Sequence, residues 1–430
     1  MAETVGDPQD AVAYINARLL DPATGLDAIG GLLTEGEVIA AVGDDLFRSG
    51  TPEGAAVVDC GGHCLAPGLV DMRVELGNLA TSGRAAAGGG ITSMVCLPNS
   101  DPVADNEAVV EFVARRARKL GLVKLYTYGA VTRGLAGSEL AELGMLADAG
   151  AVAFTDATHA IADARLMRMA LSYGSTFGLL IVNHPEEPGL AEYGVMNDGE
   201  TATRLGLAGI PRQAEVIMVE RDVHLAALTG GRLHVPHVST ADALDAISRA
   251  KQRGVNVTCD TAPPYFALNE TAIGDYRTFA KLSPPLRNED DRQAVVAGLK
   301  NGTIDVIASD HVPRDEESKR LPFAEAAAGG VGLNTLLAIS LELYHNGHLG
   351  LLDVFRLITQ APADLLNLPA GRLEVGRPAD LLVFDPDRGW KVDAKTLLSQ
   401  AKNSPFDRRP VQGTVLTTVV DGRNIYQLED

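Results

Sequence analysis

Hydrophobic and polar positions follow three successive patterns along the chain. In residues 12–66, short apolar runs of β type alternate with turns, and no long amphipathic helix is visible. In residues 66–313, apolar runs alternate with helical stretches such as residues 106–120 and 241–252. In residues 373–428, the short β-type runs return. We therefore expect a β/α region between two β-structured segments.

Eight apolar runs in the middle of the chain are candidates for buried strands. Eight β/α units predict an α/β fold with a TIM (β/α)8 barrel, whose active site lies at the carboxyl ends of the strands. The two flanking segments are expected to complete one small β-sandwich, so we divide the chain into residues 1–66, 67–370 and 371–430. The candidate strands are residues 66–76, 90–97, 124–131, 151–155, 177–183, 232–238, 255–260 and 303–309.

The first candidate strand of the barrel ends in three alternating polar residues. Asp71, Arg73 and Glu75 follow an apolar run, and the period of two in a strand sends them to one side. Polar groups at the end of a buried strand are costly unless they meet partners. We therefore expect a functional site to begin here.

Side chains able to bind a metal follow four other candidate strands. For a single histidine, a hydrogen-bonded structural role is the more common explanation. The joint pattern of aspartate and histidine at several strand ends is more specific, and imidazole with carboxylate suits zinc or a similar divalent ion. These side chains are Asp156, His184, His237, Asp310 and His311, and Asn99 adds an amide after the second strand.

Charge and cysteine content narrow the function classes. The formal net charge of −19 disfavours nucleic acid and anionic membranes as partners, because both require a basic surface. We find no run of about 18 apolar residues that predicts a membrane span and no signal peptide. Four cysteines in 430 residues favour a reducing cytoplasm. Cys60, His63 and Cys64 have the spacing of half a zinc site, but no second pair follows, so we do not favour a metal there.

Several segments resemble the dihydroorotase branch of the cyclic amidohydrolases, and the resemblance covers nearly the whole chain. It implies that Asp156, His184 and His237 are metal ligands and that Asp310 is the general base. It also implies that Asn99 helps to hold the substrate carboxylate, while a metal-bound hydroxide attacks a ring amide. The segments are Pro67-Gly68-Leu69-Val70-Asp71, Phe154-Thr155-Asp156, Asn183-His184-Pro185-Glu186-Glu187, His237-Val238-Ser239-Thr240 and Ile307-Ala308-Ser309-Asp310-His311-Val312-Pro313.

The chain departs from the family pattern at the first strand. Where the family has two zinc-binding histidines and then an arginine, this chain has Arg73, Glu75 and Gly77. Glutamate can replace one ligand, but a guanidinium stays protonated and has no lone pair for a metal. We expect Arg73 to substitute for the charge of the metal and to pair with Asp156 and Asp310. In the alternative, Arg73 turns to solvent and pairs with Glu75.

These departures favour a dihydroorotase-like protein of pyrimidine biosynthesis that has lost most or all activity. The resemblance implies a structural partnership with aspartate carbamoyltransferase, and we also expect a homo-oligomer. The alternative is a working cyclic amidohydrolase with one residual zinc site, formed by Asp156, His184 and His237. At most one zinc, or no cofactor, is therefore expected. A binding protein that uses the old pocket is a third possibility.

Overall fold

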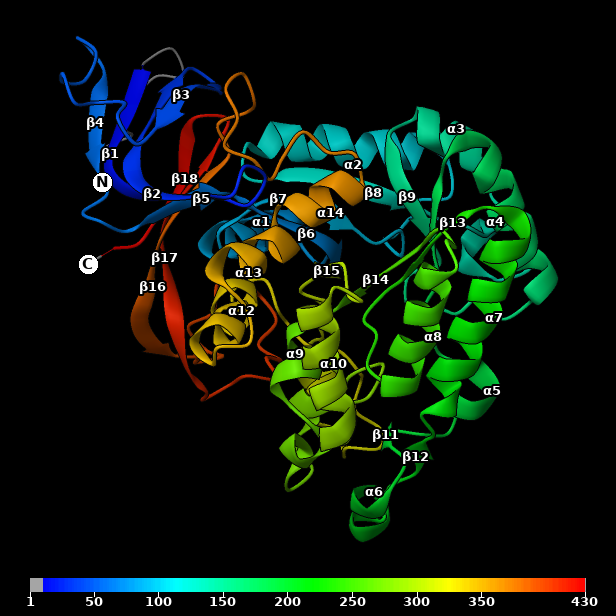
Figure 1. Ribbon diagram of the computed structural model, residues 1–430. Helices are drawn as coiled ribbons and strands as arrows, with labels where there is room; N and C mark the ends of the chain where they lie inside the picture. Colours follow the sequence, from blue (N-terminus) through cyan, green and yellow to red (C-terminus); the bar gives the residue numbers. More distant parts are fainter. Residues whose placement is uncertain (1–10, 430) are drawn as a thin grey trace.

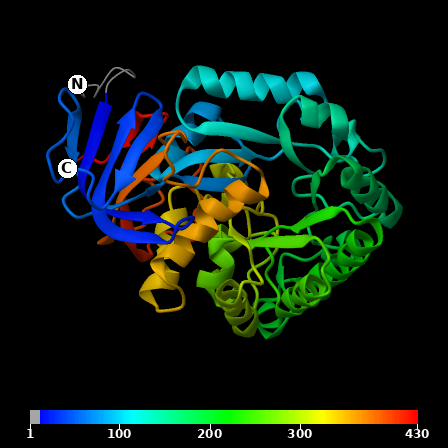
Figure 2. The same ribbon diagram turned by 45° about the horizontal axis from the view of Figure 1, so that its top comes forward.

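The computed structural model describes residues 11–429 and has two parts, a barrel and a sheet formed by the two ends of the chain (Figure 1). Figure 2 shows the blue and red strands of the terminal sheet together at one side of the barrel. This arrangement confirms the predicted class, an α/β barrel with a small sandwich-like domain built from the terminal segments.

The barrel consists of eight parallel strands in sequential order, with helices between most of them. A bridge between Val74 and His311 joins the two ends of the sheet, so the barrel closes. The strands are β6 (Leu69–Val74), β7 (Ile91–Cys96), β8 (Lys124–Gly129), β9 (Ala151–Thr155), β10 (Leu180–Val182), β13 (Arg232–Val235), β14 (Val257–Thr261) and β15 (Val306–Ile307).

Helices and short 3-10 turns (η) connect these strands and follow the last one. Two of the predicted helices begin at side-chain caps, because Asn106 and Thr240 accept hydrogen bonds from the first turns of α2 and α8. The helical segments are α1 (Leu79–Gly88), α2 (Glu107–Leu120), η1 (Arg133–Leu135), α3 (Leu143–Asp148), α4 (Ala164–Phe177), α5 (Pro188–Ala191), α6 (Glu200–Leu205), α7 (Gln213–Thr229), α8 (Ala241–Gln252), α9 (Pro263–Ala267), η2 (Glu270–Ile273), η3 (Thr278–Ala280), α10 (Glu289–Asn301), α11 (Glu316–Arg320), α12 (Leu336–His345), α13 (Leu351–Ile358) and α14 (Gln360–Leu365).

The terminal sheet interleaves the two ends of the chain. Its order is β18-β17-β16-β5-β1-β2-β3, with β4 pairing on β1, and the antiparallel pair β5–β16 joins the two ends. Its strands are β1 (Ala11–Asp21), β2 (Leu26–Glu35), β3 (Val38–Gly43), β4 (Ala56–Asp59), β5 (Cys64–Pro67), β16 (Leu381–Lys391), β17 (Pro410–Val420) and β18 (Arg423–Gln427), and β11 (Met196–Asn197) pairs with β12 (Gly209–Ile210) elsewhere.

Each predicted barrel strand overlaps an observed one, and the differences lie at the ends. Phe177 was expected to start a strand but is the last residue of α4, because Gly178 adopts a left-handed conformation (φ 68°) that ends the helix, and the strand begins at Leu180. The first predicted strand is divided at Gly68, since its first two residues belong to β5. A Cβ at Gly68 would lie 2.0 Å from the Thr92 side chain, so only glycine fits this crossing.

The barrel interior is apolar next to β6, where Val70 and Met72 pack with Val95 and with Ala363 of α14. The polar side chains described below lie at the carboxyl ends of the strands, as the fold predicts. Among residues 11–429, no helix combines the length and apolar character that crossing a bilayer requires.

Candidate active site

Arg73 lies inside the mouth of the barrel and forms an ion pair with Asp310. Its Nε donates to Oδ1 of Asp310 at 2.8 Å, and its Nη2 donates to the Ala157 carbonyl at 3.3 Å. The Arg73 side chain is 3% exposed and that of Asp310 13%. Burial raises the pKa of Asp310, while the guanidinium opposes that shift. The expected pairing of these two residues is confirmed, and the alternative in which Arg73 turns to solvent is wrong.

Asp156 does not pair with Arg73, so this part of the expectation is wrong. Its carboxylate accepts hydrogen bonds from the Thr132 hydroxyl, the Thr132 N–H at 2.9 Å and the Val131 N–H at 3.0 Å. The loop after β8 therefore supplies the partners that we had assigned to the guanidinium. Burial nevertheless raises the pKa of Asp156, and the hydrogen bonds oppose the shift.

His184 and His237 face each other. Nδ1 of His184 lies 3.1 Å from Nε2 of His237, so one of these nitrogens carries the shared proton. Nε2 of His184 lies 3.2 Å from Glu186, which also accepts from the Ser283 hydroxyl at 2.8 Å. Glu186 lies in the segment already identified by resemblance, although sequence reasoning did not single it out.

His237 is buried in a strained conformation. Its φ is +38°, and its N–H donates to Asp260 at 2.7 Å. Burial, together with the nearby charge of Arg73, places the pKa of His237 well below its usual value, so its ring is neutral near pH 7. Its Nδ1 has no hydrogen-bond partner within residues 11–429.

His234 and Asp260 hold this region in place, and sequence reasoning missed both. His234 lies between the Thr258 hydroxyl and the Asp260 carboxylate, at 2.8 Å from each. The other oxygen of Asp260 fixes the backbone of His237. The signal was the position of Asp260 at the end of the seventh predicted strand.

Asp71 and Glu75 also reach the segment after β15, so the three polar residues of the first strand converge as predicted. Asp71 accepts from the Ser309 N–H at 3.0 Å, and burial raises its pKa to about 6. Glu75 pairs with both terminal nitrogens of Arg314 and accepts from Asn99 at 3.1 Å. Asn99, expected to bind a substrate carboxylate, contacts this carboxylate of the protein. Arg314 directly follows the eighth segment, but no sequence pattern marked it.

The donor groups, as arranged, do not fit a two-ion centre. Among residues 11–429, no three His, Cys, Asp or Glu side chains are grouped so that they could hold an ion, and this includes the segment of Cys60, His63 and Cys64. The Arg73 guanidinium adds a permanent positive charge beside Asp310 and His237, which opposes a divalent cation.

Comparisons with solved structures define the class of protein. The fold matches the L-hydantoinase (dihydropyrimidinase) of Arthrobacter aurescens with a TM-score of 0.85, at 27% identity, covering 97% of this chain and 96% of that one. The dihydropyrimidinase of Brevibacillus agri shares the fold, with a TM-score of 0.82 at 24% identity over 97% of this chain and 95% of that one. The barrel and terminal sheet are thus those of a cyclic amidohydrolase.

Sequence comparison narrows this class to one family. A dihydro-orotase-like family model matches residues 62–243, and an amidohydrolase family model matches residues 216–426. Two relatives named dihydroorotase, from Syntrophotalea carbinolica and Anaplasma phagocytophilum, are 44% and 43% identical; each alignment covers 97% of this chain, with 100% and 96% of the respective relative. The chain belongs to the dihydroorotase family of the amidohydrolases.

Proposed function

We propose that this family member has lost most or all dihydroorotase activity and serves pyrimidine biosynthesis as a structural partner of aspartate carbamoyltransferase. The observation that carries the proposal is the buried ion pair between Arg73 and Asp310. In the family this aspartate is the general base, and the position of Arg73 holds a metal ligand. A base that is held by a guanidinium at 2.8 Å is poorly placed to shuttle a proton.

The groups that would hold a substrate are also engaged or absent. Asn99 and Arg314 both donate to Glu75, so these two donors are engaged with a carboxylate of the protein. Gly77 stands where the family has an arginine. The missing substrate-holding arginine at Gly77 and the missing metal ligands at Arg73 and Glu75 are what relaxed selection for catalysis would produce. The barrel itself is retained.

The partnership is tested by purification with aspartate carbamoyltransferase from the same organism. We expect the two chains to co-elute as one complex in size-exclusion chromatography and to raise each other's melting temperature, because a partner that binds only the folded state stabilises it. If the chain elutes separately at micromolar concentrations of both proteins, the structural role is wrong.

A second candidate function is a working dihydroorotase with one metal ion. The pair of His184 and His237 favours it, because the facing nitrogens lie 3.1 Å apart and would both offer lone pairs to one ion once the proton between them is lost. By the family resemblance Asp156 would be the third ligand, and its carboxylate would have to leave its Thr132 and Val131 donors, because no three such side chains are grouped within residues 11–429 as they stand. The high identity to relatives named dihydroorotase agrees with this alternative as well.

Metal analysis and an assay of ring opening and closure separate the two functions. We expect less than stoichiometric zinc and no turnover above the background of a protein-free control. Stoichiometric zinc with turnover that disappears in Asp310→Ala would establish the second function instead. The purification experiment is independent of this result, since an active enzyme can also assemble with the carbamoyltransferase.

A further inference from the structure

A large cavity lies beside the mouth of the barrel and borders the site described above at Gly77, His311 and Arg314. Its volume is about 1030 Å³, which is at the upper end of the range for small-molecule sites. Four parts of the chain line it: residues 77–82 after β6, Phe279 of η3, residues 311–320 after β15, and residues 391–408 between β16 and β17. Arg73, Asp310, His184 and His237 are not among the lining residues.

The cavity lining is basic, although the protein is acidic. Seven lysine and arginine residues and four aspartate and glutamate residues line it, in a chain of net charge −19. Two of the acidic groups are already paired, Glu316 with Arg320 and Asp407 with Arg408. A third, Asp315, caps α11 by accepting from the Ser318 N–H. Four lysines of the lining have no carboxylate within 4.0 Å in the described part of the chain: Lys319, Lys391, Lys395 and Lys402.

Lys319 is buried in the wall of the cavity without a counter-charge. It is 4% exposed, and its ammonium donates to the carbonyls of Thr278 at 3.0 Å and Lys281 at 3.3 Å. Burial and the neighbouring charges of Arg314 and Lys281 lower the pKa of Lys319 to about 7. Buried cations are normally paired, so an anion in the cavity would stabilise the charged form of this lysine.

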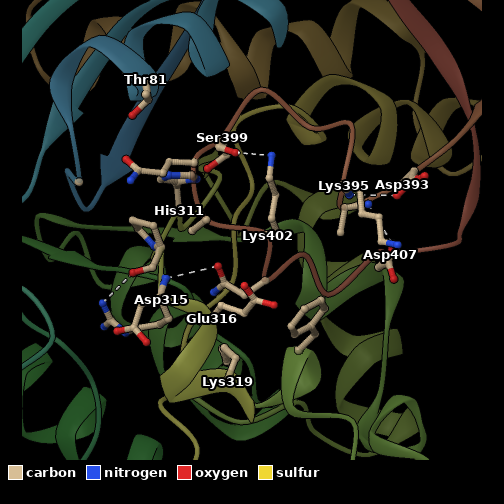
Figure 3. A pocket seen from close by; sticks show the side chains of 18 of the residues that line it. Thr81, His311, Asp315, Glu316, Lys319, Asp393, Lys395, Ser399, Lys402 and Asp407 are labelled. Atoms are coloured by element: carbon tan, nitrogen blue, oxygen red, sulfur yellow. Dashed lines mark hydrogen bonds between the residues drawn. The ribbon is translucent and has the colours of Figure 1, made fainter.

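Figure 3 shows lysines on two sides of the cavity, Lys319 on α11 and Lys395 and Lys402 on the segment between β16 and β17. Lys402 donates to the carbonyls of Leu397 and Ser399, which hold it in place without neutralising it. Lysines from two parts of the chain that are distant in sequence therefore line one space.

The amino terminus of α1 adds to the positive potential. Asn78, Thr81 and Ser82 line the cavity, and the first turn of this ten-residue helix carries no acidic residue. The N–H groups at a helix amino terminus and the helix dipole favour anions. Asn78 accepts from two of these N–H groups, so the contribution here is the dipole rather than a direct contact.

We propose that this cavity binds a small organic polyphosphate of nucleotide size. Several separate ammonium groups suit a chain of phosphates, whereas a single carboxylate is matched better by one arginine fork. The volume is large enough for more than the phosphates, and Phe279 in the lining offers an aromatic face for a base. The proposal is independent of whether the protein catalyses ring opening.

Isothermal titration calorimetry of the full-length protein tests the proposal, with inorganic tripolyphosphate and ATP as probes. We expect saturable binding of one molecule per chain, with ATP at least as tight as tripolyphosphate. The double variant Lys391→Glu/Lys395→Glu should bind roughly tenfold or more weakly, because two attractive charges become repulsive. Both lysines are exposed, and neither side chain has a recorded hydrogen bond in the described residues, so the variant should fold.

Two controls make the result specific. Lys300→Glu changes the charge at the exposed end of α10, outside the cavity lining, and should leave the affinity unchanged. Citrate carries its negative charges on carboxylates, and fewer of them, and should bind more weakly than tripolyphosphate. The proposal is overturned by absent or unsaturable binding, by equal affinity in the cavity and Lys300 variants, or by citrate binding as tightly as tripolyphosphate. Equal melting temperatures of the unliganded variants exclude misfolding as the cause of a lost affinity.

Discussion

Replacing Arg73 by methionine should lower the free energy of unfolding by about 3–5 kcal/mol, the range for removing one partner of a buried ion pair. Methionine fills a similar volume, but it leaves the Asp310 carboxylate largely buried with no counter-charge. The Ala157 carbonyl also loses a donor. Denaturant unfolding followed by circular dichroism measures the loss.

The loss of stability in Arg73→Met should increase as the pH rises. In Arg73→Met, burial raises the pKa of Asp310 above its value in the unfolded chain and the opposing guanidinium is gone. The folded variant then binds a proton more tightly than the unfolded chain does, so its stability falls as pH rises. The penalty should therefore be larger at pH 7 than at pH 5.

Two variants show whether the charge is responsible. Arg73→Lys keeps a positive charge and should lose less stability than Arg73→Met. In the double variant Arg73→Met/Asp310→Asn, the buried charge is removed, so the total loss should be smaller than the sum of the two single losses. If the losses of stability are additive, or if Arg73→Met leaves the free energy of unfolding unchanged, the ion pair does not stabilise the barrel.

Introducing the two histidines of the family pattern should create a zinc site. The double variant Arg73→His/Glu75→His removes the guanidinium beside Asp310 and supplies two imidazoles at the end of β6, close to the pair of His184 and His237. Imidazole and carboxylate ligands together suit zinc. We expect about one more zinc per chain than in the wild type, measured by mass spectrometry of metals after dialysis.

A matched control separates ligand chemistry from simple opening of the site. Arg73→Lys/Glu75→Gln alters the same two positions but keeps the positive charge and adds no imidazole, so its zinc content should equal that of the wild type. Equal zinc in all three proteins would show that the guanidinium is not what opposes the metal. Zinc alone is not expected to produce turnover, because Gly77 stands where the family resemblance implies an arginine that holds the substrate.

The barrel was predictable because its strands are buried on both faces and therefore appear as continuous apolar runs. Their ends were less certain, since an apolar residue such as Phe177 fits the end of a helix as well as the start of a strand. The glycine that follows it decides between the two, because Gly178 takes the left-handed conformation that terminates α4.

A contact of the site was predictable only where a buried charge required a partner of opposite charge. A buried guanidinium needs an anion, and the pairing of Arg73 with Asp310 follows from that requirement. The Asp156 carboxylate has other partners, because the Thr132 hydroxyl and the N–H groups after β8 donate to it. Nothing in the sequence of that loop marks the loop as a source of these donors. The pair of Glu75 and Arg314 and the basic cavity depend on how residues 309–314 and 391–408 fold over the barrel mouth, which no local pattern encodes.

The pairing of β5 with β16 has a consequence for synthesis of the protein on the ribosome. Residues 64–67 bond to residues 381–384, so this edge of the amino-terminal strands has no partner until more than 300 further residues have been made. During translation that edge stays unpaired and open to pairing with other chains, while the barrel forms from the residues between β5 and β16. The sheet is completed only when β16–β18 have been released from the ribosome. Chains truncated before β16 should therefore aggregate even though their barrel sequence is complete.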